Sequence, residues 1–103
     1  MSDPVPAPED CQTMADVRRG VDATDRELMS LLEQRFGYMR AAARIKPNRA
    51  AVRDEERKAR VIAAAVADAQ ARALPSEVIE QLWERLVEGS IAYEFDIWDK
   101  TRT

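Results

Sequence analysis

Six polar side chains in this sequence lie on or beside apolar helical patterns, where burial is expected. They are Arg18, Arg35, Lys46, Arg57, Ser90 and Glu94. An ionised group that is buried without a partner destabilises a protein by several kcal/mol, so each of these residues needs a reason to be there. Four cations with few carboxylates near them would suit a pocket for a dianion. We therefore expect this set to bind a small molecule with two negative charges.

The amino-acid types that are absent exclude other kinds of chemistry. The sequence has no histidine and a single cysteine, Cys11. Catalytic triads, Cys/His pairs, histidine metal sites and an internal disulfide are therefore excluded, and a thiolate metal cluster is not expected. Any chemistry must use arginine, lysine, carboxylates, hydroxyls or the main chain.

Composition narrows the class of protein and its partners. The chain has 103 residues, of which 46% are hydrophobic and 34% charged, with a formal net charge of −3. These values fit a single soluble domain with one core and argue against nucleic acid as a partner. No apolar run is long enough to span a membrane, and the first eight residues are polar and include three prolines. We expect a cytoplasmic protein that does not bind a membrane.

The stretch from Thr13 to Lys46 predicts one long helix. Its apolar residues recur at the spacing of a single helical stripe, namely Met14, Val17, Val21, Leu28, Leu31, Leu32, Phe36, Met39 and Ala43. The helix would be roughly 50 Å long, whereas a compact domain of this size has a radius of gyration of about 13 Å. Such a helix cannot bury its stripe against its own chain alone.

The spacing of the cations on this helix predicts a second copy of the chain. Arg18 and Arg35 are seventeen positions apart, which is about 25 Å along a helix axis, so one small ligand cannot contact both on the same helix. Lys46 follows Arg35 by eleven residues, or three turns plus about 20°, and returns to nearly the same face. If Arg18 joins Arg35 and Lys46, it must come from the partner of a homodimer.

The remaining sequence predicts two more helices and no strand. Residues 1–11 contain three prolines and should form a flexible or extended arm, followed by a helical domain over residues 12–103. Pro47 to Arg53 should be a short loop, after which Asp54 caps a helix that ends near Ala73. Pro75 then opens a third helix, whose stripe runs from Val78 to Trp98. We therefore predict an all-α fold with three helices per chain, one of them very long, in an intertwined homodimer.

Each polar residue also has a structural explanation. Glu94 would then lie at the edge of its apolar stripe and pair with an arginine. Arg35 and Lys46 could form salt bridges, and Arg18 could be a solvated charge. Asp54 would be only a helix cap and Arg57 only a surface residue, on a helix that begins with acidic residues.

The sequence resembles the all-helical chorismate mutases of the AroQ type. The resemblance rests on Arg18 after Ala15-Asp16-Val17, Arg35 after Glu33-Gln34, Lys46 after Ala43-Arg44-Ile45, the run Val52-Arg53-Asp54-Glu55-Glu56-Arg57, and Ser90 with Glu94. The spacing is preserved from Pro8 to Trp98. Pro8-Glu9-Asp10-Cys11 and the short loop after Lys46 are similar to isochorismate pyruvate lyase, a relative with the same fold that makes salicylate.

The resemblance implies an intertwined dimer with two shared sites, which agrees with the spacing of Arg18 and Arg35. Arg18 of one chain and Arg35 of the other would bind the substrate carboxylates. Lys46 and Glu94 would flank the ether oxygen of the enolpyruvyl group. The other substrate-binding residues would be Arg57, Ser90 and the main chain of Asp54. Lys46, Glu94 and Arg35 would be the catalytic residues.

Two positions depart from the family pattern. Where many relatives have a glutamine beside the ether oxygen, this chain has Glu94, a variant also met among mutases. Where many of these mutases have a glutamate that accepts a hydrogen bond from the substrate hydroxyl, this chain has Lys58, which cannot accept one. The choice between chorismate and isochorismate therefore stays open at this position.

The resemblance implies a chorismate mutase of aromatic amino-acid biosynthesis, which rearranges chorismate to prephenate without a metal or a cofactor. Isochorismate pyruvate lyase is the first alternative: Ser90 and the Arg53-Asp54 pair favour the mutase, and the Pro8–Cys11 segment and the loop favour the lyase. A non-catalytic helical dimer used for interaction is the second alternative.

Overall fold

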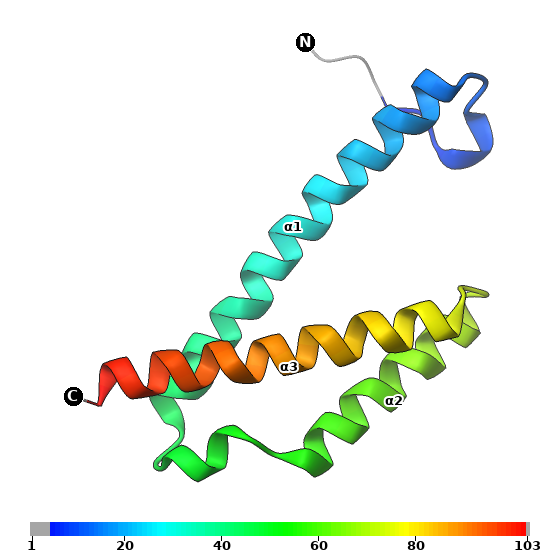
Figure 1. Ribbon diagram of the computed structural model, residues 1–103. Coiled ribbons are helices and arrows are strands. Elements are labelled where there is room, and N and C mark those ends of the chain that lie inside the picture. The colour runs from blue at the N-terminus through cyan, green and yellow to red at the C-terminus, as the bar shows by residue number, and fades with distance from the viewer. Residues whose placement is uncertain (1–4, 103) are drawn as a thin grey trace. The chain divides into compact units, whose positions relative to one another are not determined.

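The computed structural model describes residues 5–102, which form three α-helices and no strand (Figure 1). The elements are, in order, the 3-10 turn η1 (Pro8–Asp10), the helix α1 (Met14–Ile45), the 3-10 turn η2 (Arg49–Val52), and the helices α2 (Glu55–Ala71) and α3 (Ser76–Thr101). The predicted all-α class with one very long helix is confirmed. Residues 1–36 and 37–103 form two compact units, which are described separately below.

Local signals fix both ends of α1. The side chain of Asp16 accepts hydrogen bonds from the main-chain N–H groups of Gln12 (3.1 Å) and Thr13 (3.3 Å), and Thr13 Oγ1 accepts one from the Asp16 N–H group. These bonds, led by the one from Gln12, lower the pKa of Asp16. The helix ends at Ile45, two residues before Pro47, because the residue before a proline avoids the α conformation. The predicted bounds are therefore confirmed to within one residue.

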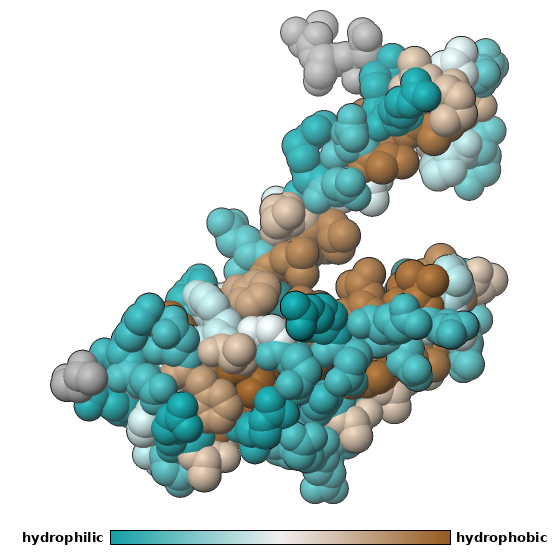
Figure 2. All heavy atoms as spheres, viewed as in Figure 1, coloured by the Kyte–Doolittle hydropathy of each residue, from teal (hydrophilic) through white to brown (hydrophobic). Residues whose placement is uncertain are grey.

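In the first unit, the apolar stripe of α1 has little to pack against. Met14, Val17, Val21, Leu28 and Leu31 are between 38% and 61% exposed. Figure 2 shows brown apolar side chains at the surface along α1. Within this unit the stripe therefore stays exposed, and the need for a second copy of the chain stays a prediction.

The stretch before α1 differs in part from the predicted arm. Residues 1–4 lie outside the described part of the chain. Pro8–Asp10, expected to be extended or flexible, form a 3-10 turn with hydrogen bonds from Asp10 N to Ala7 O (2.9 Å) and from Cys11 N to Pro8 O (3.3 Å). The reason is that proline is well suited to the first position of a helical turn, since its missing N–H group is not needed there.

The second unit is built on an antiparallel hairpin of α2 and α3 (Figure 1). Asp54 caps α2, because its carboxylate accepts a 3.0 Å hydrogen bond from the Arg57 N–H group. The helix ends at Ala71, two residues earlier than predicted, and Ala73 adopts a left-handed φ of 57° in the turn before Pro75. The short loop predicted after Lys46 contains η2, whose first turn is capped by the side chain of Asn48.

The core of the second unit lies where the hairpin meets η2. Val52, Val87 and Ile91 are buried there, and five half-buried residues pack around them: Val61, Ile62, Trp83, Phe95 and Trp98. Ala43, in the last turns of α1, is fully buried. Across the described residues, no helix is both long and apolar enough to cross a membrane.

Candidate functional site

Lys46, which is half-buried, and Glu94, which is buried, form an ion pair in the second unit. Lys46 directly follows α1, whereas Glu94 lies on α3, and the Lys46 Nζ is 2.7 Å from the Glu94 Oε2. The Glu94 side chain is 5% exposed and that of Lys46 is 29% exposed. The Lys46 Nζ also donates a long hydrogen bond, 3.4 Å, to the Val52 carbonyl oxygen in η2. The fold therefore brings the two residues proposed for the ether oxygen into direct contact.

The carboxylate of Glu94 is incompletely satisfied. Its Oε2 is buried and, despite the 2.7 Å approach of Lys46, has no hydrogen bond of suitable geometry from any described residue. The structural explanation of Glu94, a stripe-edge residue paired with an arginine, is wrong: the residue is buried and its partner is a lysine. A buried acceptor in this state has capacity for a further donor.

Ser90 lies one turn before Glu94 on the same face of α3, and its side chain is buried too. The Ser90 Oγ donates a 2.7 Å hydrogen bond to the Leu86 carbonyl oxygen, one turn back along the helix. A serine hydroxyl can both donate and accept hydrogen bonds. Ser90 and Glu94 thus present two adjacent polar groups on a largely apolar face.

The other expected ligands are less buried. Asp54 is exposed and caps α2, as its structural explanation predicts, and Arg57 is exposed in the first turn of that helix. Arg18 and Arg35 belong to the first unit, where Arg18 is exposed and Arg35 half-buried. Their convergence with Lys46 stays a prediction.

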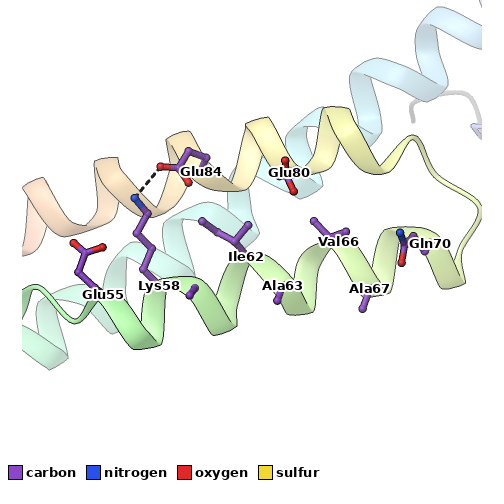
Figure 3. A pocket seen from close by; sticks show the side chains of 10 residues that line it. Glu55, Lys58, Ile62, Ala63, Val66, Ala67, Gln70, Glu80 and Glu84 are labelled. Atoms are coloured by element: carbon purple, nitrogen blue, oxygen red, sulfur yellow. Dashed lines mark ion pairs between the residues drawn. The ribbon is translucent and has the colours of Figure 1, made fainter.

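Lys58, one of the two departures from the family pattern, is held by two carboxylates of α3. Its Nζ is 2.8 Å from Glu84 Oε1, the pair drawn with a dashed line in Figure 3, and 2.9 Å from Glu88 Oε2. Arg53 donates two further hydrogen bonds to Glu88, at 3.0 and 3.1 Å. Arg53 and Lys58 together lower the pKa of Glu88 to about 2, and Glu84, followed by Glu88, raises the pKa of Lys58. The i, i+4 spacing of the two glutamates was the signal for this network, which the sequence analysis missed.

A groove between α2 and α3 lies beside this network (Figure 3). Its volume is about 550 Å³, and its lining includes Ala59, Ile62, Ala63 and Val66 of α2 and Glu80 and Glu84 of α3. Lys46, Ser90 and Glu94 do not line it. We place the candidate site at the Lys46–Glu94 pair, because that is where the structure buries charge.

Two residues that contact Lys46 were not expected from the sequence. Trp98 and Arg102 donate hydrogen bonds to the Lys46 carbonyl oxygen. Trp98 follows Glu94 by four residues on α3, and Arg102 comes four residues later, directly after the helix. This spacing was the available signal.

Comparison with known proteins defines the class to which this fold and site belong. The sequence model of the family "Chorismate mutase type II" matches residues 17–95, so the chain belongs to that family. A curated relative, an isochorismate pyruvate lyase of Pseudomonas aeruginosa, is 32% identical over 95 residues, which cover 92% of this chain and 94% of the relative.

Proposed function

We propose that this protein is a chorismate mutase that rearranges chorismate to prephenate in aromatic amino-acid biosynthesis. The observation that carries the proposal is the ion pair between Lys46 and the buried Glu94, in a chain of the chorismate mutase type II family. The rearrangement is pericyclic and needs no nucleophile, metal or cofactor. This requirement suits a chain without histidine.

Catalysis would come from positioning and from electrostatics. The ring-to-ether bond breaks while a new carbon–carbon bond forms, so negative charge develops on the ether oxygen in the transition state. The Lys46 ammonium, which is half-buried beside Glu94, would stabilise that charge more strongly than water does. Holding the substrate in its compact diaxial conformer would supply the rest of the rate enhancement.

The other residues would bind and orient the substrate. Arg18 and Arg35 are assigned to the two carboxylates, with Arg57 and Ser90 in support. Glu94 would flank the ether oxygen opposite Lys46, and for this it must carry a proton, because a carboxylate only accepts hydrogen bonds. The main chain of Asp54 would contact the ring-hydroxyl region.

This assignment requires a homodimer with two shared sites, which we propose as well. The exposed apolar stripe of α1 needs a partner surface, and burying it against a second copy would remove apolar side chains from water. The partner would then supply Arg18 to the site that contains Arg35 and Lys46. We further propose that the dimer works in the cytoplasm.

A second reaction has support of its own. The relative at 32% identity is named an isochorismate pyruvate lyase, and Lys58 replaces the glutamate expected to accept the substrate hydroxyl. Elimination of pyruvate from isochorismate is also pericyclic, breaks the same kind of ether bond, and would use the same cations. Isochorismate pyruvate lyase activity is therefore our second candidate.

One experiment separates the candidates. Purified protein is incubated with chorismate and, in parallel, with isochorismate, and the products are identified by chromatography and mass spectrometry. Prephenate from chorismate supports the mutase, whereas salicylate and pyruvate from isochorismate support the lyase. No turnover and no binding of either compound would overturn both and favour a non-catalytic helical dimer.

A further inference from the structure

The carbonyl group of Lys46 is held by two side chains from the end of α3. Trp98 Nε1 donates to the Lys46 oxygen at 3.2 Å, and Arg102 Nη2 donates to the same oxygen at 2.8 Å. Arg102 Nη2 also lies 3.1 Å from the Ala43 oxygen and 3.5 Å from the Arg44 oxygen. The guanidinium stacks on Trp98, with Cζ 4.7 Å from the ring centroid. One cation and one indole thus cover the end of α1.

These carbonyl groups are available because α1 stops there. The last carbonyl groups of a helix have no partner within the helix, and Pro47 has no N–H group to offer. A cation at this end also interacts favourably with the helix dipole. Arg102 and Trp98 therefore take the place of the helical turn that Pro47 prevents.

The same face of α3 contacts both ends of Lys46. Glu94 and Trp98 are four residues apart and lie in one row along α3, and Arg102 follows four residues later, directly after the end of the helix. Glu94 contacts the ammonium group at 2.7 Å, while the other two hold the carbonyl oxygen. A lysine side chain is long and flexible, so fixing its main chain restricts where its ammonium can go.

We propose that Trp98 and Arg102 are positioning residues, which fix the main chain of Lys46 so that its ammonium group reaches the reacting oxygen of the bound substrate. This inference rests on the proposed function. Substrate would draw the ammonium away from Glu94, but the bonds to the carbonyl oxygen do not involve the ammonium and would persist. Small displacements of a catalytic group lower the rate strongly even when binding is preserved.

The chain offers a matched control. Arg49 binds Asp99 through two hydrogen bonds of 2.9 and 3.2 Å, and its guanidinium lies 4.4 Å from the centre of the Phe95 ring. This pair joins the same two segments, the stretch after α1 and the end of α3, without contacting Lys46. Asp99→Asn therefore weakens the docking of the segments and leaves the Lys46 anchors in place.

The test compares kcat and KM of the wild type with those of four variants, using the substrate that the wild type converts. Trp98→Phe removes the indole N–H group but keeps a ring for packing, and should lower kcat about fivefold with KM changed less than about twofold. Arg102→Ala should lower kcat by roughly thirtyfold, and Arg102→Lys should recover part of the loss. Asp99→Asn should stay within about twofold of the wild type.

A second readout does not depend on turnover. The ammonium signal of Lys46, assigned by its loss in Lys46→Ala, is followed by nitrogen-15 NMR without substrate. Trp98→Phe should shift or broaden this signal, and Asp99→Asn should leave it unchanged.

The outcomes separate the two proposals. If the wild type converts neither substrate, the proposed function fails, and the NMR comparison alone decides the positioning inference. Trp98→Phe indistinguishable from Asp99→Asn in both kcat and the Lys46 signal would overturn the inference. If Arg102→Ala does not fold, Trp98→Phe decides.

Discussion

Two charged clusters in the second unit are each centred on a glutamate of α3 but differ in burial and in the number of cations. Glu88 is partly exposed and receives three hydrogen bonds from Arg53 and Lys58. Glu94 is buried, has one ammonium group beside it, and its Oε2 lacks a hydrogen bond from the described residues. The first arrangement is complete and fastens α2 to α3. The second retains bonding capacity in a dry environment, which is what a ligand site needs.

The largest expected effect comes from removing the cation beside Glu94, Lys46. Lys46→Ala should lower kcat/KM roughly a thousandfold, because the charge on the ether oxygen develops only in the transition state. Circular dichroism and size-exclusion chromatography should show the helical content and assembly unchanged. Lys100→Ala, at an exposed lysine of α3, is the control for loss of a positive charge. Wild-type turnover in Lys46→Ala would exclude the site from catalysis.

The next prediction asks whether the buried site is completed by a second chain. Arg18→Ala and Arg35→Ala should each be inactive in a homodimer, since each removes a carboxylate ligand. Subunit exchange between them produces heterodimers with one intact site, so an equal mixture should recover about a quarter of wild-type activity. Mass spectrometry of tagged chains verifies the exchange. No recovery after exchange would remove the cross-chain role of Arg18.

The same substitution at the two glutamates sharpens the comparison. Glu94→Gln keeps a hydrogen-bond donor of similar shape beside the ether oxygen, so it should keep kcat/KM within about tenfold of the wild type, whereas Glu94→Ala should lower it by roughly a hundredfold. Glu88→Gln should stay within about twofold of the wild type. Steady-state kinetics of the three variants check this, and an inactive Glu94→Gln would contradict the proposed donor.

The smallest effect is expected on stability, when low pH protonates Glu88 in the partly exposed cluster. Glu88 has a pKa of about 2 in the folded chain against an ordinary value of 4.5. Its stabilising contribution is therefore complete above 4.5 and is lost as pH falls from 4.5 through about 2. Denaturant unfolding should show Glu88→Gln less stable than the wild type at about pH 6 and the difference shrinking below about pH 4. A difference that is constant with pH would mean that titration of Glu88 is not its source.

Local sequence signals determined the helices of this protein. Pro47 ends α1, Asp54 caps α2 and Pro75 precedes α3, and each acts through its own main chain or that of close neighbours. The exposure of the α1 stripe also followed from sequence, because the length of a helix depends only on its residue count. The 3-10 turn at Pro8–Asp10 did not, since prolines are compatible with both extended and turn conformations.

The partners of the charged residues were decided by the tertiary structure. The periodicity of α3 marked Glu94 as a polar residue on an apolar face, but only the packing of residue 46 against α3 selected Lys46 rather than an arginine. Likewise, the sequence shows that Lys58 cannot accept a hydrogen bond and that Arg102 carries a positive charge, but it does not show what either residue contacts. Their contacts with Glu88 and with the Lys46 carbonyl oxygen join residues 30 and 56 positions apart. Periodicity shows which face of a helix a side chain occupies, whereas its partner depends on how the helices pack together.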